Sequence, residues 1–349
     1  MKKIICVLIA CISISLNFTS CASVKNESYQ KSNIVMDTAV TLSAYGANSK
    51  EAVEESFKKL DEINEMASTN ISTSDVYKIN NSSGKSYVKV QPEILKMIET
   101  SIEYSKLSNG AFDITLGPLI NLWGIGTDNE RLPSDKEIKD ILPLVGYDQI
   151  SINENDSSVM LKKEGMAIDL GGIAKGFAAD EVLKIYKKYN IKNGLINLGS
   201  SSIYALGKNK DNKEWSVGIK HPRSEDSKEY MGIIKLTNES LSTSGDYERV
   251  FIKDNKRYHH IIDPKTGYPE DNGVMSDTIV IDGNTPDNGM LADILTTTVF
   301  VLGPEKGLNL VNNLSGVSCE ITTSDYKVYT SDKFKDRIID LNKEFKFAN

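Results

Sequence analysis

The chain's most suggestive stretch for chemistry is DLGGIAKGFAAD, at residues 169–180. Asp169 ends an apolar run, and Gly171 and Gly172 would let the backbone approach a ligand closely. A helix that begins directly after them would point free N–H groups at an anion, with Lys175 in its first turn. This pattern predicts a phosphate site. The same residues would also suit an ordinary joint between a strand and a helix, with a surface lysine.

A second candidate site lies in ADILTTTVFVL, at residues 292–302. The apolar spacing predicts a helix, on which Asp293 and Thr297 are four residues apart and share a face. Carboxylate and hydroxyl oxygens are ligands that a hard cation such as Mg²⁺ prefers. In the alternative interpretation, Asp293 caps the helix and the Thr297 hydroxyl bonds to the backbone.

The run GAFDITLGPLINLWGIG, at residues 110–126, places one carboxylate among apolar residues. Gly117-Pro118 interrupts any regular element, and Asp113 would be costly in a core without a partner. We therefore expect a buried turn against a ligand. The alternative is a plain strand and a short helix with Asp113 as the helix cap.

Two of the three histidines are adjacent, at His259 and His260, just before IIDPKTGYP. Neighbours on a strand point to opposite faces, so we expect one of them to face a site and the other to face solvent. The nearby run Ser242–Gly245 (STSG) lacks the first glycine of the GxSxG motif, so it does not indicate a serine hydrolase. We expect it to be a structural cluster of hydroxyls.

The elements that must position these residues follow from hydrophobic periodicity. The pattern predicts a strand over 35–45, helices from residues 48, 92 and 173 onward, a helix and hairpin within 127–165, and a meander of strands over 195–262. Residues 68–91 are polar and rich in turn signals. We therefore expect an α+β fold with mostly antiparallel sheets packed with helices.

Composition excludes several classes of protein. With 349 residues, 40% hydrophobic and 26% charged, the chain is long enough for a well-packed core. Its 41 basic and 48 acidic residues give a net charge of −7, and no basic stretch invites nucleic acid. The four cysteines include no CxxC pair, so neither a disulfide framework nor a zinc site is predicted.

The N-terminus has the form of a targeting segment. Lys2 and Lys3 precede an apolar run over residues 4–16, and Phe18-Thr19-Ser20-Cys21 follows, which resembles the lipobox of bacterial lipoproteins. We expect residues 1–20 to be a signal peptide, Cys21 to carry lipid, and residues 21–33 to be a flexible tether. The folded domain would span 34–349, outside the cytoplasm and anchored to the cell membrane. A plain secreted protein cut near Ala22 is the alternative.

Seven motifs, in order, resemble the FAD:protein FMN transferases, the ApbE-type flavin transferases. They are AFDITLGPLINLWGIG, DLGGIAKGFAAD, LINLG, WSVGIKHP, STSGDY, HIIDPKTGYP and ADILTTTVFVLG, and the resemblance covers about Met36 to Gly303. It implies a T-fold-like α+β architecture, FAD as the donor substrate, and Mg²⁺. It also implies transfer of FMN through a phosphoester bond to a threonine or serine hydroxyl of an acceptor protein, with release of AMP.

The resemblance also implies roles for particular residues. Positions that match flavin contacts are Met36, Ala111, Phe112, Asp113, Asp169, Lys175, His260 and Ile261, and positions that match metal ligands are the Ala174 carbonyl, Asp293 and Thr297. Asp293 and His260 are the candidate catalytic residues, with His260 as the general base. The chain departs from the family in having Met36-Asp37-Thr38 for Met-Gly-Thr and Asn70 where an aromatic residue is frequent.

The resemblance implies partners as well. The acceptor would be a protein with an FMN-binding domain, such as a subunit of a membrane redox pump. Two other functions would need the same pocket: an FAD-binding lipoprotein without transfer activity, and a Mg²⁺-dependent FAD pyrophosphatase that yields FMN and AMP.

Overall fold

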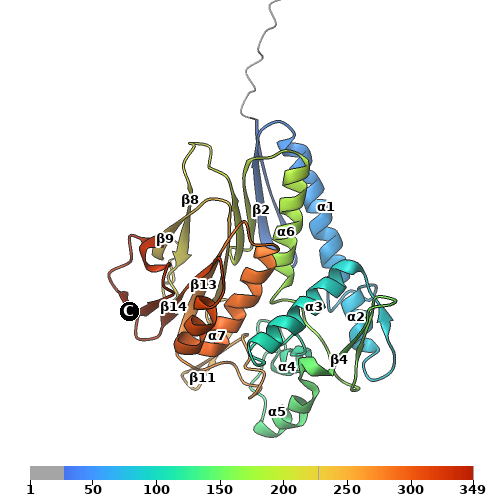
Figure 1. Cartoon of the computed structure of the whole chain (residues 1–349). Helices are drawn as coiled ribbons and strands as arrows, with labels where there is room; N and C mark the ends of the chain where they lie inside the picture. Colours follow the sequence, from blue (N-terminus) through green and yellow to red (C-terminus); the bar gives the residue numbers. More distant parts are fainter. Residues whose placement is uncertain (1–26, 227, 349) are drawn as a thin grey trace, which may run out of the picture.

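A nine-stranded sheet forms the frame of the computed structural model, which describes residues 27–226 and 228–348 (Figure 1). In spatial order its strands are β1 (Ser28–Val35), β2 (Thr38–Tyr45), β6 (Asn193–Leu198), β7 (Ser202–Leu206), β10 (Glu239–Gly245), β13 (Val274–Asp282), β14 (Val317–Thr323), β15 (Lys327–Thr330) and β17 (Lys346–Phe347). Neighbouring strands pair antiparallel, except β15 and β17. The expected α+β class with mostly antiparallel sheets is confirmed.

Three smaller sheets complete the strands. They contain β16 (Ile338–Ile339), β9 (Tyr230–Leu236) and β8 (Trp215–Lys220); β3 (Val88–Lys89), β5 (Ser158–Leu161) and β4 (Ile150–Asn153); and the hairpin of β11 (Val250–Lys253) and β12 (Lys256–His259). The predicted turn of that hairpin, Asp254-Asn255, has φ of 51° and 58°, as a tight hairpin turn requires.

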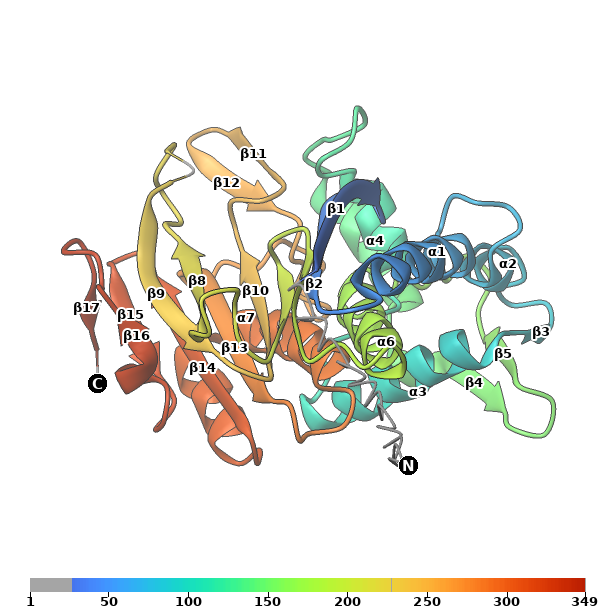
Figure 2. The same ribbon diagram turned by 90° about the horizontal axis from the view of Figure 1, so that it is seen from above.

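The helices of the described residues are α1 (Ser49–Ala67), α2 (Asp75–Asn81), α3 (Pro92–Leu107), α4 (Gly117–Trp123), α5 (Asp135–Ile141), α6 (Ala174–Lys188) and α7 (Asn288–Asn312). Three of them, α1, α6 and α7, cover one face of the large sheet. Helices α1, α6 and α7 lie side by side over successive parts of the sheet (Figures 1 and 2). None of the helices in the described residues is both long and apolar enough to span a bilayer.

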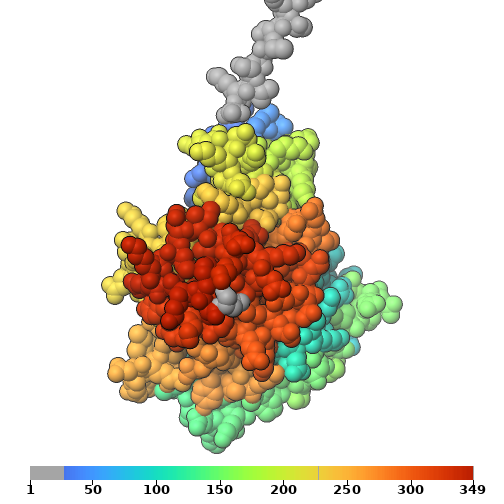
Figure 3. Space-filling model, turned by 60° about the vertical axis from the view of Figure 1, so that its left-hand side comes forward, coloured from blue at the N-terminus to red at the C-terminus, as the bar shows by residue number. Residues whose placement is uncertain are grey.

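The other face of the large sheet is covered at its β13–β15 end. Apolar side chains of β8 and β9 pack there against Met275, Val280 and Val328, and Phe334 and Phe345 of the C-terminal segment close this core. Figure 3 shows the C-terminal segments, in red, spread over that side of the molecule. Cys319 is buried and free, and lies in the separate core beneath α7.

The predicted tether is wrong over residues 28–33, because these residues already belong to strand β1 (Ser28–Val35). Strand β1 pairs with β2 along its whole length. The Tyr29 hydroxyl and the Lys31 ammonium both donate to Glu54 of α1, at 2.8 and 2.7 Å. Backbone pairing and these contacts hold a strand whose polar composition resembled a linker. The predicted signal peptide and Cys21 lie outside the described residues.

The predicted strand over 35–45 is in fact the end of β1, a turn and β2. Met36 and Asp37 both have φ of 55°, the left-handed conformation that a two-residue hairpin turn needs. Aspartate tolerates this conformation better than most residues, because its short polar side chain can bond locally. The turn places Met36 beside the pocket described below.

Helix α2 was not predicted within residues 68–91. Ser74 caps it by accepting from the Tyr77 N–H. Its Asn80 side chain makes two bonds to the backbone of Ile168, donating to the carbonyl at 2.9 Å and accepting from the N–H at 2.7 Å. Helix α2 therefore fixes the chain directly before Asp169.

Candidate active site

A pocket of about 510 Å³ collects all the predicted flavin and metal positions. On its wall lie Met36, Ala111, Phe112, Asp113, Asp169, Ala174, Lys175, His260, Ile261, Asp293 and Thr297. These residues come from the β1–β2 turn, the loop before α4, the start of α6, the segment after β12, and α7. Its volume is within the usual range for small-molecule sites.

A close crossing of α6 and α7 builds one end of the pocket. A Cβ on Gly176 would lie 2.1 Å from the Gly289 carbonyl oxygen and 2.8 Å from the Asp293 Cβ, so only glycine permits this approach. Both oxygens of Asp180 on α6 accept backbone N–H groups of α7, from Gly289 and Met290, each at 2.9 Å. Asp180, the last residue of the predicted phosphate motif, therefore holds the two helices in register.

Asp293 points from α7 into this crossing. Its Oδ2 accepts from the Gly176 N–H and its Oδ1 from the Ser202 hydroxyl, both at 3.0 Å. The side chain is buried, and the N-cap residue of α7 is Asp287, so the interpretation of Asp293 as a helix cap is wrong. Each carboxylate oxygen keeps a further lone pair for a ligand. Ser202 was not predicted, since nothing in its local sequence marks it.

Thr297 lies one turn further along α7 and differs from its neighbours. Thr296 and Thr298 bond to backbone carbonyls, whereas the Thr297 hydroxyl has no hydrogen-bond partner among residues 27–226 and 228–348. It lies beside the glycine pair, because a Cβ on Gly172 would be 3.5 Å from its Oγ1. A carboxylate, a free hydroxyl and the Ala174 carbonyl are an oxygen donor set that fits Mg²⁺.

The predicted phosphate site has fewer free N–H donors than a bare helix N-terminus. The N–H groups of Ile173 and Ala174 both bond to the Leu170 carbonyl, and that of Gly176 bonds to Asp293. No side chain caps α6. Lys175, whose ammonium lies 3.3 Å from the Gly171 carbonyl, must therefore supply much of the attraction for an anion.

Asp113 has its oxygens occupied by the protein. Its Oδ1 accepts from the N–H and hydroxyl of Thr115, and its Oδ2 from the Tyr147 N–H. Burial nevertheless raises the pKa of Asp113. The predicted buried turn is present, and α4 follows it with Leu116 as N-cap, so Asp113 is not the helix cap. Its main effect is to shape the turn that carries Phe112.

His259 is buried, contrary to the prediction that one of the two adjacent histidines faces solvent, and His260 is partly buried. His259 bonds through Nε2 to the Glu270 carbonyl at 2.8 Å and packs edge-on against Phe300. His260 faces the pocket, and its buried Nδ1 has no partner in the described part of the chain. Burial and then the nearby Arg249 lower the pKa of His260 to about 3, so its ring is neutral at neutral pH.

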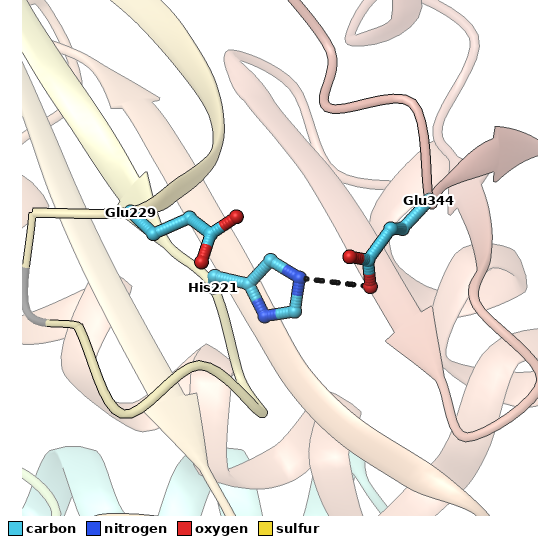
Figure 4. A group of neighbouring side chains, drawn as sticks. All are labelled: His221, Glu229 and Glu344. Atoms are coloured by element: carbon cyan, nitrogen blue, oxygen red, sulfur yellow. Dashed lines mark ion pairs between the residues drawn. The ribbon is translucent and has the colours of Figure 1, made fainter.

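Away from the pocket, His221, Glu229 and Glu344 bring three potential metal ligands within 4.8 Å of one another (Figure 4). The Nδ1 of His221 accepts the backbone N–H groups of Arg223 and Ser224. A neutral ring therefore carries its proton on Nε2, which lies 3.5 Å from a Glu344 oxygen. A metal on Nε2 would force that proton onto Nδ1, against two donors. This cluster instead attaches the C-terminal segment.

The fold and pocket define an α+β protein with a candidate binding site of about 510 Å³, a size suited to a small ligand. The chain belongs to the ApbE family, whose sequence model matches residues 36–321. The expected family and architecture are thereby confirmed.

Relatives and solved structures agree with this membership. Proteins named FAD:protein FMN transferase are 31% identical over 306 residues in Klebsiella pneumoniae (88% of this chain, 92% of the relative) and 32% identical over 334 residues in Treponema pallidum (91% and 90%). The crystal structure of the ApbE protein from Thermotoga maritima matches with a TM-score of 0.80 and 32% identity. The flavin transferase ApbE from Vibrio cholerae matches with 0.79 and 29%. Both matches cover 89% of this chain and 99% of the other.

Proposed function

We propose that this protein transfers FMN from FAD to a serine or threonine hydroxyl of an acceptor protein and releases AMP. The observation that carries the proposal is the meeting of Lys175, Asp293 and Thr297 in a pocket whose wall also carries apolar side chains, among them Met36, Phe112 and Ile261. Such a pocket suits a ligand with a flat ring system and a pyrophosphate. The names of the relatives add the reaction type.

Different pocket residues would bind the flavin and neutralise the charge of the phosphates. Met36, Phe112 and Ile261 offer apolar surface to a flavin ring. Lys175 faces the pyrophosphate, whose negative charge rises as AMP leaves. The α6–α7 crossing holds these groups on rigid helices, so little reorganisation is needed when the reaction occurs.

A magnesium ion fits the same end of the pocket. Asp293, Thr297 and the Ala174 carbonyl would hold it, and the ion would neutralise charge on the phosphates. Asp293 remains fixed by Gly176 and Ser202 in this role, because those two donors leave lone pairs free.

The proposal is tested by incubating the protein with FAD, Mg²⁺ and a purified candidate acceptor domain, followed by intact mass of the acceptor and chromatography of nucleotides. We expect one FMN phosphoester per acceptor and an equal amount of AMP. FMN supplied in place of FAD is the matched control, because it has no AMP to release. Free FMN with AMP and an unmodified acceptor would indicate a pyrophosphatase, and bound but intact FAD would indicate a storage protein.

We also propose that the protein works outside the cytoplasm, held to the membrane by lipid on Cys21. The support is the sequence alone: two lysines, an apolar run and the Phe18–Cys21 box. Replacing Cys21 with Ala should release the protein from membranes, whereas Cys11→Ala, within the predicted signal peptide, should not. A Cys21→Ala protein that stays membrane-bound after signal cleavage would contradict the anchor.

A further inference from the structure

The mouth of the pocket is marked by those lining residues that are exposed to solvent. They are Asp37 on the β1–β2 turn, Asn70 after α1, Ile120 on α4, Gly171 before α6, and Glu248 and Arg249 before β11. A folded acceptor protein cannot enter a cavity of about 510 Å³, so the surface that presents its hydroxyl must rest on this rim. The side chains around the mouth therefore decide which surface fits.

Exposed isoleucines are concentrated at this mouth. Seven large apolar side chains of the described residues are exposed, and the two most exposed are Ile34, at 71%, and Ile252, at 65%. Ile34 lies two residues before Met36, which lines the pocket, and Ile252 lies three residues after Arg249. Ile120, at 37%, lines the pocket itself. Single exposed apolar side chains are ordinary, but three from separate elements around one opening indicate a surface that binds another protein.

The hairpin of β11 and β12 adds positive charge on one side of the mouth. Residues 249–257 (RVFIKDNKR) contain four cationic side chains and one carboxylate, a net charge of +3 in a chain whose net charge is −7. Lys256 pairs with Asp271 at 2.8 Å. The other three cations have no ion pair within residues 27–226 and 228–348. This side of the mouth therefore favours a partner with negative charge.

The base of the hairpin is fixed to the pocket wall. The Arg249 carbonyl accepts the His260 N–H at 3.1 Å, so the backbone pairing of the hairpin continues to the pocket. The rings of Phe251 and Tyr258 stack with centroids 5.2 Å apart. Tyr258 also packs on Trp123 of α4, at 5.6 Å between centroids, and the hairpin lies beside α4 (Figure 2). The hairpin is thus held in a fixed position at the rim.

The outer part of the hairpin combines an apolar side chain with cations. Ile252 lies directly opposite Arg257 in the register, and Lys253 is the next residue along β11. Paired residues on antiparallel strands project from the same face, so Ile252 and Arg257 are neighbours. Such a surface complements a partner on which an apolar patch lies beside carboxylates.

We propose that the mouth surface, which consists of Ile34, Ile120, Ile252, Lys253 and Arg257, docks the acceptor protein. The complementary surface would be an apolar patch flanked by carboxylates, next to the serine or threonine that receives FMN. This inference rests on the proposed function. A bilayer also attracts exposed apolar side chains and cations, but a mouth pressed against lipid would be closed to an acceptor.

The test measures transfer to the purified candidate acceptor domain as the acceptor concentration is varied at saturating FAD and Mg²⁺. Ile252→Asp removes the most exposed apolar contact of the hairpin, and the double variant Lys253→Glu/Arg257→Glu reverses two of its cations. Far-ultraviolet circular dichroism and FAD affinity establish that each variant folds and binds its donor.

Matched control variants carry the same changes away from the mouth. Ile339→Asp alters an exposed isoleucine of β16, and Lys208→Glu/Lys210→Glu reverses two exposed cations of the β7–β8 loop. None of these three residues lines the pocket. We expect both controls to keep the wild-type KM for the acceptor.

We expect Ile252→Asp and the double hairpin variant each to raise the KM for the acceptor about tenfold, as loss of an important interface contact does. The kcat at saturating acceptor and the FAD affinity should stay close to wild type, because the pocket is unchanged. The wild-type KM should rise with salt, since screening weakens attraction between opposite charges, and the double variant should lose most of that dependence. Equal KM values in wild type and both hairpin variants would overturn the inference.

Two further measurements identify other occupants of the mouth surface. If the hairpin variants lose binding to vesicles of anionic phospholipid while their KM for the acceptor is unchanged, a lipid surface replaces the acceptor. If they change only from dimer to monomer in sedimentation, the occupant is a second copy of this chain. Either result overturns the inference.

Docking can also be measured without transfer. Calorimetry of the acceptor with FAD-loaded protein in the absence of Mg²⁺ should show binding that the hairpin variants weaken about tenfold. That result together with no transfer by wild type in the presence of Mg²⁺ would support the docking surface and count against the proposed function alone.

Discussion

Two pairs of buried carboxyl groups in this protein differ in how many of their oxygens have hydrogen-bond partners. At the crossing of α6 and α7, every oxygen of Asp180 and Asp293 accepts a hydrogen bond. In the middle of the large sheet, both oxygens of Asp277 and one of Glu320 have no partner within the described residues. The exposed fraction is 5% for each residue of the first pair and 0% for each of the second.

The difference lies in what each region offers to a negative charge. The start of α7 and the first turn of α6 supply backbone N–H groups, which favour an ionised carboxylate at a fixed position. The interior of a sheet has its N–H groups committed to neighbouring strands, so a carboxyl group there is more stable with its proton. The crossing therefore fixes the positions of its carboxyl oxygens, although burial still raises the pKa of Asp180 to about 6. In the sheet, burial raises the pKa of Glu320 to about 7.

The largest expected effect on FMN transfer comes from removing Asp293, the predicted cation ligand at the crossing of α6 and α7. Asp293→Ala should lower FMN transfer by roughly 10³-fold or more, because a cation ligand is lost at the reacting phosphates. The fold should survive, at a cost of about 1–2 kcal/mol from the two donors left without Asp293. Transfer rates against Mg²⁺ concentration, with urea denaturation beside them, measure both. Unchanged Mg²⁺ dependence in this variant would refute the assignment.

The next effect concerns the neutral histidine of the pocket, His260. As the general base, His260→Ala should lose roughly 10²-fold or more in single-turnover rate with FAD affinity nearly intact. As an orienting group, the same change should weaken FAD binding and lower the rate only modestly. The pKa of about 3 favours the second outcome, because so weak a base accepts little of a proton at neutral pH. A rate close to wild type at saturating FAD removes His260 from the chemistry.

A third prediction concerns how the free energy of unfolding depends on pH through Glu320. The pKa of Glu320 is about 7 in the fold and near 4.5 when unfolded, so between these values the folded state binds the extra proton. Stability should therefore fall as pH rises from 4.5 to 7, by on the order of 3 kcal/mol for this group. Glu320→Gln should remove that loss, and the exposed Glu65→Gln should not. Urea midpoints at pH 5 and pH 8 measure this loss of stability. An equal change in midpoint between the two pH values in wild type, Glu320→Gln and Glu65→Gln would contradict the prediction.

The smallest expected effect tests the link between the helices. Asp180→Asn keeps one oxygen and so loses one of two bonds to the start of α7. We expect a loss of about 1 kcal/mol in the free energy of unfolding, as for other helix caps, and a small drop in transfer rate. Thermal or urea unfolding checks the first value. A decrease as large as that of Asp293→Ala would mean that Asp180 does more than hold the helices together.

Much of the pocket was predictable because its residues lie in local motifs. The eleven predicted flavin and metal positions all line it, and the helices that begin near residues 48, 92 and 173 are present. Glycine pairs, caps and apolar spacing act over a few residues, so a single segment contains the information. The strand β1 and helix α2 were missed because both segments are polar, and their stability comes from pairing and distant contacts.

What the sequence by itself determined is which residues line the pocket; the tertiary structure decided which of their polar groups are left without a protein partner. The N–H groups at the start of α6 were a predicted anion site until Leu170 and Asp293 proved to bond several of them. Likewise, STSG was a plain hydroxyl cluster until strand register placed Thr243 opposite Thr278 of β13, and Thr278 opposite Glu320 of β14. Such register depends on pairing between segments far apart in the chain, and local periodicity does not encode it.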